Sequence, residues 1–585
     1  MTNKLTYITA GLLLFIMFLT SFSSMIGDSL TFDELAHIPA GYSYLTQQDY
    51  RINPEHPPLI KDISAIPLLF LNLNFPKEDQ TWLQEDSAPA WWVQFDLGRK
   101  FIFESGNDPR NIIIWARIPM ILLTIFLGFF IFKWTRELAG NLAAILALFL
   151  FSFSPTILAH GRLVTTDVGA ALGALMATYF WLKFLRDPKK LNIVLAGLFF
   201  GIAMISKFSL VLLIPFFGII TILYPVFKYR KERMKNVLNY LLKSVLVGLI
   251  ALVFVIFPIY QLHVLNYPAD QQKRDTAADL APNKVTLLKN LDIWMSDKPV
   301  LKPLAQYLRG VLMASQRTVF GNTVYFLGQI SASAWWYYFP LIFILKVPLA
   351  LIELFLIVLV GLLYLLIRKK IQFGDFHQKF IIFSLILFLL IYWAAAMLGN
   401  LNIGIRHLMP TFPFVYILLA LGLKMVIIDR KFSLKKPVLA VIFIVFAWYA
   451  VSSASSFPYY ISYYNELAGG SKSGLKYAVD SNYDWGQDFY RLLDFIDKNN
   501  IEQIHLDYFG GESPEYWLGE KYLKLNPKEI KEPPSGWIAV SLNQLVGGIA
   551  KPVPGFDQET GYYNWLSEYT PEARIGYSIL VYKID

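Results

Sequence analysis

Long apolar runs separated by short clusters of basic residues are the feature that most constrains this sequence. A run of about 20 apolar residues can cross a bilayer as a helix, because a helix satisfies its own backbone hydrogen bonds where water is absent. In a chain of 585 residues, of which 55% are hydrophobic and 16% charged, we expect about eleven such helices. The predicted spans are 7–25, 112–133, 140–158, 163–183, 191–206, 208–227, 238–261, 340–367, 380–398, 408–428 and 437–455. The sequence therefore predicts a polytopic α-helical membrane protein.

The basic clusters occupy every second connection between these spans. Because loops rich in Lys and Arg stay in the cytoplasm, we expect a multi-pass protein of the cell membrane with a cytoplasmic N-terminus and an external C-terminus. The formal net charge of +9 is thus explained by topology, and we expect no nucleic-acid partner. The clusters are Lys133 with Arg136, Lys183 to Lys190, Lys228 to Lys235, Arg368 to Lys370, and Arg430 to Lys436.

The same pattern predicts two domains. Residues 1–456 form the membrane domain, with two long external loops at 27–111 and 263–335. The first loop contains an apolar stretch, 63–73, that is too short to span and is expected to lie along the interface as a juxtamembrane helix. The polar tail, 457–585, is expected to form a small extracytoplasmic α/β domain, with a helix at 488–498 and strands at 504–509, 537–542 and 578–582.

Several kinds of chemistry are excluded. The chain has no cysteine, so it forms no disulfide, thiolate metal site or cysteine nucleophile. No Walker loop, dinucleotide fingerprint or HExxH motif is present, which argues against ATP, NAD and zinc-protease chemistry. The acidic, aromatic segment 480–488 is typical of a carbohydrate- or calcium-binding surface in composition, but it lacks the EF-hand spacing. We therefore expect no metal site and no cofactor.

An acidic pair directly follows the first span. Asp33 and Glu34 lie in the stretch TFDELAH, where a partly desolvated carboxylate could act as a general base on an acceptor hydroxyl. The alternative is structural, with Thr31 or Asp33 capping the N-terminus of a juxtamembrane helix.

A second candidate element is the stretch NPEHPPLIK at 53–61. Its proline pair stiffens the chain and favours the start of a helix. His56 and Lys61, next to Glu55, could donate hydrogen bonds to a phosphate. The alternative is an ordinary loop whose lysine reaches from the interface towards water.

Further ionisable residues are predicted at outer helix ends. Arg162 and Asp167 lie in the turn HGRLVTTD between two spans, where a charge facing the bundle interior is costly and suggests function. A capped helix start at Thr165 or Thr166 is the structural alternative. Each of these cations alone is typical of a side chain anchored at the membrane interface. Several of them on the same side of the membrane would form a phosphate-binding site. These cations are Lys207, Lys346 and Arg406, the last followed by His407.

In this order the elements resemble the phospholipid-carrier-dependent glycosyltransferases of the GT-C fold, close to the protein O-mannosyltransferase family (glycosyltransferase family 39). The resemblance rests on the acidic pair, the HPPLxK element at 56–61, and Arg162 with its downstream Asp167. The stretch from Tyr463 through Asp488 resembles the start of the external domain in prokaryotic members. Aminoarabinose transferases of lipid A are similar but carry Lys at the position of His56.

The resemblance implies the roles of these residues. Asp33 corresponds to the catalytic base, with Glu34 helping to position it. Cations around the external cavity bind the phosphate of a polyprenyl-phosphate sugar, which implies His56, Arg162 and Arg406, and further Lys61, Lys207 and Lys346. Glu55, Asp167 and His407 are expected in support. The family lacks a nucleotide requirement, and the acceptor could be a protein, a lipid or a glycan.

Two functions remain open at this point. In a transferase, Asp33 removes a proton from the acceptor hydroxyl while the hydroxyl oxygen displaces polyprenyl phosphate from the anomeric carbon, which inverts its configuration. The sugar is expected to be mannose or another hexose. In a transporter or flippase for a lipid-linked or anionic glycan, the same charges would line a translocation path. The sequence shows no related halves, which a transporter of this kind often has.

Overall fold

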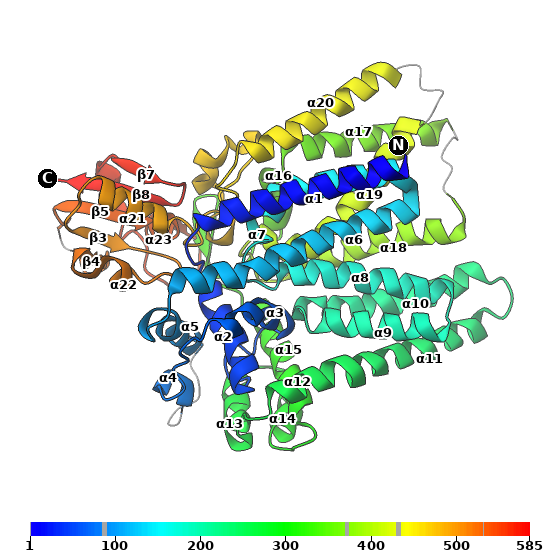
Figure 1. The fold of residues 1–585 in the computed structure, drawn as a ribbon, viewed down its shortest axis with the longest axis horizontal. Helices are drawn as coiled ribbons and strands as arrows, with labels where there is room; N and C mark the ends of the chain where they lie inside the picture. The colour runs from blue at the N-terminus through cyan, green and yellow to red at the C-terminus, as the bar shows by residue number, and fades with distance from the viewer. Residues whose placement is uncertain (1, 85–90, 369–373, 429–434, 531) are drawn as a thin grey trace.

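A computed structural model describes residues 2–84, 91–368, 374–428, 435–530 and 532–585. Residues 369–370 and 430–434 of two basic clusters lie outside this description. Helices run side by side along most of the molecule, and a smaller domain containing a sheet lies at one end (Figure 1). The start of the chain and the C-terminal domain lie at opposite ends of the bundle.

Within the described residues, nine helices are long and apolar enough to cross a membrane. One of them, α6, is two helices joined at Gly140, whose φ of 77° is left-handed. A shorter apolar helix, α9 (Lys190–Met204), lies between α8 and α10. Taking α6 as two crossings and adding α9 brings the nine to the eleven that the apolar runs predicted. The nine are α1 (Asn3–Ile26), α6 (Pro109–Ser152), α8 (Asp167–Arg186), η3 with α10 (Phe208–Leu212, Leu213–Lys228), α11 with η4 and α12 (Arg233–Ala251, Leu252–Ile256, Phe257–His263), α17 (Leu349–Ile367), α18 (Phe376–Leu398), η5 with α19 (Ile405–Thr411, Phe412–Ile428) and α20 (Lys435–Ala454).

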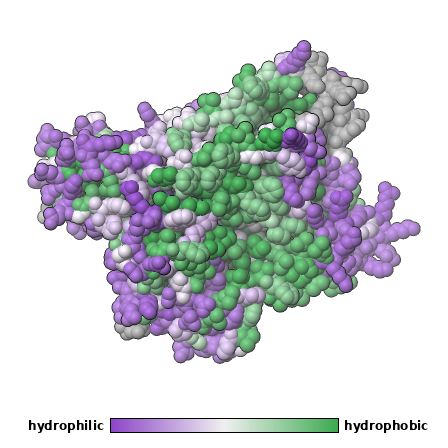
Figure 2. All heavy atoms as spheres, viewed as in Figure 1, coloured by the Kyte–Doolittle hydropathy of each residue, from purple (hydrophilic) through white to green (hydrophobic). Residues whose placement is uncertain are grey.

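The surface of the bundle matches a bilayer. An apolar band covers its middle and is flanked by hydrophilic residues at both ends (Figure 2). Large apolar side chains in this band are exposed, among them Phe443 at 75% and Val360 at 65%. A water-soluble protein rarely exposes so large a contiguous apolar surface. The polytopic helical membrane architecture expected from the sequence is therefore confirmed.

Two expected spans differ from the observed helices. The run 340–367 divides into α16 (Tyr338–Lys346) and α17, because Pro348 has no backbone N–H and disfavours helix at the residue before it. The run 163–183 becomes helical only from Asp167, after α7 (Pro155–His160) and a non-helical turn at 161–166.

The two long loops at 27–111 and 263–335, which are expected to be external, are largely helical. The first loop leads from the C-terminal end of α1 into α2, which carries the acidic pair at its start. Its elements are α2 (Glu34–Gln47), α3 (Leu59–Ala65), η1 (Ile66–Phe70), α4 (Gln80–Leu83), α5 (Val93–Arg99) and η2 (Lys100–Glu104). The second loop contains α13 (Ala269–Asp279), α14 (Thr286–Met295), α15 (Lys302–Phe320) and the hairpin β1 (Val324–Phe326) and β2 (Gln329–Ser331).

The tail forms a mixed five-stranded sheet in the order β4-β3-β5-β8-β7. β3 lies parallel to β4 and β5, whereas β5, β8 and β7 are antiparallel. A short parallel pair between β2 and β6 joins the second external loop to this domain. The elements are η6 (Glu466–Ala468), η7 (Ser471–Lys476), η8 (Asp480–Asn482), α21 (Phe489–Lys498), β3 (Ile504–Asp507), α22 (Pro514–Leu518), η9 (Gly519–Lys521), β4 (Tyr522–Lys524), β5 (Gly536–Ser541), α23 (Leu542–Ile549), β6 (Lys551–Pro552), η10 (Asn564–Glu568), β7 (Ala573–Ile575) and β8 (Ile579–Ile584).

Candidate active site

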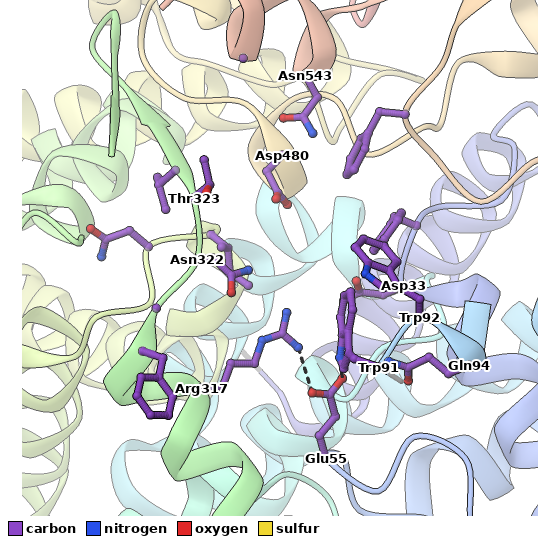
Figure 3. A pocket seen from close by; sticks show the side chains of 18 of the residues that line it. Asp33, Glu55, Trp91, Trp92, Gln94, Arg317, Asn322, Thr323, Asp480 and Asn543 are labelled. Carbon is purple, nitrogen blue, oxygen red and sulfur yellow. Dashed lines mark hydrogen bonds and ion pairs between the residues drawn. The ribbon is translucent and has the colours of Figure 1, made fainter. Parts of the chain in front are cut away.

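A cavity of about 890 Å³ lies where the membrane domain, both external loops and the tail meet (Figure 3). The first loop contributes Asp33 and Glu55 to its lining, and the second loop contributes Arg317. Arg406, in η5 directly before α19, and Asp480, from the tail, also line it. Segments hundreds of residues apart thus build one site.

The carboxylate of Asp33 faces this cavity and is not used as a helix cap. Asp33 precedes α2 but makes no capping hydrogen bond through its side chain. Its Oδ2 lies 2.9 Å from Nη1 of Arg406, and its side chain is 22% exposed. The helix start is instead braced by Thr31, whose backbone N–H and hydroxyl both donate to Glu34 Oε2 at 3.0 and 2.9 Å. The geometry therefore leaves Asp33 available to a ligand.

Glu34 points the opposite way, into the protein. Its carboxylate accepts hydrogen bonds from Nε and Nη2 of Arg117, at 2.9 and 2.6 Å, and from the backbone N–H of Val164 at 2.9 Å. Burial alone would raise the pKa of Glu34, but the Arg117 guanidinium and these hydrogen bonds hold it below its ordinary value. Glu34 does not line the cavity; it ties α2 to α6 and to the turn before α8.

The acidic, aromatic segment of the tail braces the loop that leads to Asp33. The backbone N–H groups of Ser29 and Phe32 donate to the carbonyls of Gln487 and Trp485, both at 3.1 Å. The hydroxyl of Ser29 also donates to the carbonyl of Gly486 at 2.7 Å. Among the described residues, no group of three or more His, Asp or Glu side chains could hold a metal ion. The segment therefore acts on the geometry of Asp33 through backbone contacts.

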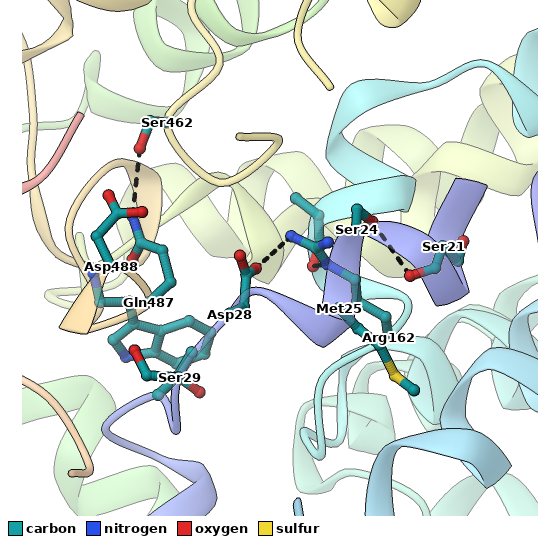
Figure 4. Close-up of polar contacts among 12 residues, drawn as sticks. Ser21, Ser24, Met25, Asp28, Ser29, Arg162, Ser462, Gln487 and Asp488 are labelled. Atoms are coloured by element: carbon teal, nitrogen blue, oxygen red, sulfur yellow. Dashed lines mark hydrogen bonds and ion pairs between the residues drawn. The ribbon is translucent and has the colours of Figure 1, made fainter. Parts of the chain in front are cut away.

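Asp28 links the membrane domain to the tail through two arginines, and Figure 4 shows its contact with Arg162. Its Oδ2 lies 2.6 Å from Nη2 of Arg162, and its Oδ1 lies 2.8 Å from Nη2 of Arg491. Arg491 also pairs with Asp488 at 2.6 Å. Arg162 is fully buried and lies outside the cavity lining. The structure thus gives Arg162 an internal partner that its position in the sequence did not reveal.

Arg406 connects the cavity to a buried ion-pair network. Beside its contact with Asp33, its Nη1 lies 3.6 Å from Asp167, which also pairs with Lys207. The Arg406 guanidinium lies 4.3 Å from the ring centroid of Trp485. Thr166 precedes α8 without a capping hydrogen bond from its side chain, and Asp167, in the first turn, pairs with two cations. Among the residues expected to contact phosphate, Arg406 lines the cavity, whereas His56, Lys61, Arg162, Lys207 and Lys346 do not.

Two of the remaining candidates organise loops. Lys61 Nζ donates to Tyr44 Oη, Asn53 Oδ1 and the carbonyl of His56, at 2.8, 2.9 and 2.8 Å. Lys346 Nζ donates to the carbonyls of Ile461 and Asn482 in the tail, at 2.8 and 2.5 Å. Both ammonium groups therefore already have close partners.

The two histidines have different surroundings. Desolvation, together with the neighbouring His37 and Lys61, holds the pKa of His56 well below its ordinary value, so its ring is neutral. The carbonyl of His407 accepts a hydrogen bond from Tyr392 Oη at 3.1 Å, and among described residues its Nε2 has no hydrogen-bond partner.

Other lining residues were not predicted from the sequence. Arg317 Nη1 lies 3.2 Å from Glu55 Oε2, and Trp91 Nε1 donates to Glu55 Oε1 at 3.0 Å. The Arg317 guanidinium lies 5.4 Å from the Trp91 ring. Arg317 follows no motif, because it lies within an ordinary amphipathic helix. Asp480 lies in the segment whose composition is typical of a carbohydrate- or calcium-binding surface, and its carboxylate faces the cavity.

Comparisons with known proteins agree with this architecture. Residues 111–257 match the family described as dolichyl-phosphate-mannose-protein mannosyltransferase. No curated protein matches the chain in sequence. The Saccharomyces cerevisiae protein O-mannosyltransferase Pmt1–Pmt2 complex bound to the sugar donor has a TM-score of 0.54 at 11% identity, over 78% of this chain and 90% of that chain.

Two further solved structures are similar over most of this chain. ArnT from Cupriavidus metallidurans bound to undecaprenyl phosphate has a TM-score of 0.45 at 12% identity, over 98% of this chain and 97% of that one. The archaeal oligosaccharyltransferase AglB from Archaeoglobus fulgidus, in complex with an inhibitory peptide and a dolichol-phosphate, has a TM-score of 0.43 at 16% identity, over 90% and 61% of the two chains.

The family match over residues 111–257 and the fold shared with the Pmt1–Pmt2 complex show a membrane protein of the GT-C fold. The resemblance to the protein O-mannosyltransferases that the acidic pair and the HPPLxK element indicated is thereby confirmed.

Proposed function

We propose that this protein transfers a hexose, such as mannose, from a polyprenyl-phosphate carrier to an acceptor hydroxyl at the outer membrane face, with inversion at the anomeric carbon. The observation that carries the proposal is the Asp33–Arg406 pair at the cavity wall. One group can accept a proton and the other can bind a phosphate. The match to the family described as dolichyl-phosphate-mannose-protein mannosyltransferase, and the similar fold of the Pmt1–Pmt2 complex bound to the sugar donor, support the choice of a lipid-phosphate donor.

The reaction needs Arg406 to change partners. A donor phosphate that binds Arg406 competes with Asp33 for the guanidinium, which releases the carboxylate as the substrate arrives. Asp33 then takes the proton from the acceptor hydroxyl as its oxygen bonds to the anomeric carbon. The bond between that carbon and the phosphate oxygen breaks, and its electron pair leaves with polyprenyl phosphate. Arg406 stabilises the charge on this leaving group.

Arg317 is a second phosphate ligand in this proposal. It projects into the cavity from the second external loop, and its side chain is 28% exposed (Figure 3). Its pairing with Glu55 at 3.2 Å is partly exposed and can yield to a phosphate. For His56, Lys61, Arg162, Lys207 and Lys346, the contacts described above favour positioning of the site over contact with the phosphate. Glu34, Asp167 and His407 have supporting roles of the same kind.

We also propose that the cavity opens on the outer face of the cell membrane, with the N-terminus in the cytoplasm and residues 457–585 outside. The basic clusters between the spans support this orientation. The C-terminal domain lies at the same end of the bundle as the two long external loops (Figure 1). A lipid-linked donor can then reach the cavity from the outer leaflet.

The test is sugar transfer from a synthetic, radiolabelled polyprenyl-phosphate hexose in membranes that contain the wild-type protein or a variant at matched expression. Asp33→Asn should abolish transfer while donor binding persists. Asp96→Asn is the control, because Asp96 lies in the same loop with an exposed side chain that pairs with Arg99 at 3.2 Å. Transfer that survives in Asp33→Asn would assign the base elsewhere. Wild-type membranes that consume no donor would refute the transferase function.

A further inference from the structure

The cavity wall built by the tail and the second external loop differs chemically from the wall around Asp33. In Figure 3, Asp480 and Asn543 project into the cavity from the tail, and Asn322 lies across the cavity from Asp33 and the two tryptophans. We name Asn322, Asp480 and Asn543 the polar wall. Asn322 belongs to the segment between α15 and β1, and Asn543 belongs to α23.

Asp480 is held so that one carboxylate oxygen remains open. Its φ of 56° lies in the left-handed region, which Asp and Asn tolerate better than other side chains with a Cβ. Its Oδ1 accepts the backbone N–H of Ser481 at 2.5 Å. Within the described parts of the chain, Oδ2 has no hydrogen-bond or ion-pair partner. A local contact therefore fixes the side chain, and the other oxygen faces the cavity.

The side-chain amides of Asn322 and Asn543 in the polar wall also have no hydrogen-bond partner among the described residues. The backbone N–H of Asn543 donates to Asp484 Oδ2 at 2.8 Å, which fixes the residue but not its side chain. The nearby cation of Lys528 already has partners, the Glu559 carboxylate at 3.8 Å and the Tyr562 ring at 5.1 Å. The polar wall can therefore form hydrogen bonds with a neutral polar ligand. It has no cation of its own to bind an anion.

Aromatic rings face the polar wall. Trp91 and Trp92 line the cavity beside Asp33, and their residues are 38% and 60% exposed. The two rings pack against each other with centroids 4.7 Å apart. An exposed indole presents a flat apolar face. The C–H face of a sugar ring matches such a surface, while its hydroxyls need carboxylate and amide partners at the edges.

We propose that the polar wall binds the acceptor, and that the acceptor is a carbohydrate. A carboxylate oxygen accepts hydroxyl protons, and an amide both donates and accepts, which are the interactions that a polyhydroxylated ring requires. The cavity volume of about 890 Å³ is near the upper end of the range of about 300–1,000 Å³ for small-molecule sites. It therefore has room for a donor sugar at Arg406 and an acceptor unit at the polar wall. This inference rests on the proposed transferase function.

The experiment uses the full-length protein in lipid nanodiscs with a polyprenyl-phosphate hexose donor. Two acceptor sets are compared: disaccharides (mannobiose, cellobiose and chitobiose) and a Ser/Thr-rich peptide. The variants are Asp480→Asn, which keeps the backbone conformation, and Asn543→Ala. Their controls are Asp497→Asn and Asn499→Ala, exposed positions of the same domain. Binding of the disaccharides is measured separately by saturation-transfer NMR.

The expected result is transfer to a disaccharide, with its KM raised about ten- to a hundredfold by Asp480→Asn or Asn543→Ala. The controls Asp497→Asn and Asn499→Ala should leave both the disaccharide KM and the slow hydrolysis of the donor unchanged. Transfer to the peptide alone, or a disaccharide KM and NMR signal that the variants do not alter, would overturn the inference. Donor hydrolysis that depends on Asp33 without transfer to a disaccharide refutes only the carbohydrate acceptor. A wild-type protein that consumes no donor refutes the transferase function itself.

Discussion

The two adjacent acids, Asp33 and Glu34, should respond to substitution in opposite ways. Glu34→Gln removes a fully buried carboxylate that faces Arg117, whereas Asp33→Asn changes a group at the cavity surface. We expect Glu34→Gln to reduce stability and Asp33→Asn to reduce catalysis. Sequence position alone would assign the two residues similar roles.

The magnitude follows from the contacts of Glu34. Its carboxylate accepts five hydrogen bonds, from Thr31 (two), Arg117 (two) and Val164. A glutamine can accept at only one side-chain atom, and its NH₂ group would face the donors of Arg117. Breaking a buried ion pair by removing one partner costs about 3–5 kcal/mol. For Asp33→Asn, loss of a general base lowers the rate about 10²–10⁴-fold, with little change in stability.

Purified variants in detergent are compared by thermal unfolding and by initial rates of sugar transfer. Glu34→Gln should unfold several degrees below wild type, and the protein that remains folded should keep its affinity for the donor. Asp33→Asn should unfold near the wild-type temperature and transfer almost no sugar. A Glu34→Gln protein as stable as wild type, or an Asp33→Asn protein with a greatly lowered Tm, would refute the assignment of the two roles.

Three further predictions concern the cavity and the tail. Arg317→Ala should raise the donor KM about tenfold in initial-rate assays, and Arg317→Lys should restore part of the lost donor affinity. An unchanged donor KM would contradict phosphate binding by this residue. Arg491→Gln should lower Tm more than Lys521→Gln, because Arg491 joins Asp28 to the tail. The pair of Lys521 with Asp497 is exposed and contributes about 0–1 kcal/mol to stability. Equal Tm shifts would show that other contacts attach the tail to the membrane domain. Burial, partly opposed by Arg406, raises the pKa of Asp480 to about 6, so the acceptor KM should rise as pH falls through about 6 and the carboxylate is protonated. Asp480→Asn should remove this pH dependence, and a variant that keeps it shows that another group titrates.

Parts of the tail could be read from local sequence patterns. The predicted helix at 488–498 is observed at Phe489–Lys498, and the predicted strands match β3, β5 and β8 within a few residues. The short strands β1, β2, β4, β6 and β7 were not predicted. The pairing of β2 with β6 joins residues more than 200 positions apart, and the backbone N–H of Lys551 donates to the carbonyl of Gly328 at 3.0 Å. Strands of two or three residues carry too little alternation to be recognised alone.

The cations illustrate the limit of the sequence. Arg162 and Arg406 both lie next to the start of a membrane helix, and the resemblance implied the same role for each. In the structure Arg162 pairs with Asp28 in the interior, whereas Arg406 faces the cavity. Arg317 lines the cavity and pairs there with Glu55, a residue 262 positions away in the sequence. No local pattern distinguishes these three arginines.

The sequence by itself determined the membrane spans, because the free energy of placing a segment in the bilayer is nearly a sum over its own residues. It also identified the acidic pair next to the first span. Only the tertiary structure decided that Asp33 faces the cavity and Glu34 faces Arg117. It also decided that residues 485–487 brace the loop before Asp33 through hydrogen bonds with Ser29 and Phe32. The physical reason is that hydrogen bonds and ion pairs depend on distances of about 3 Å between groups, and only the folded chain brings residues so far apart in sequence within that range.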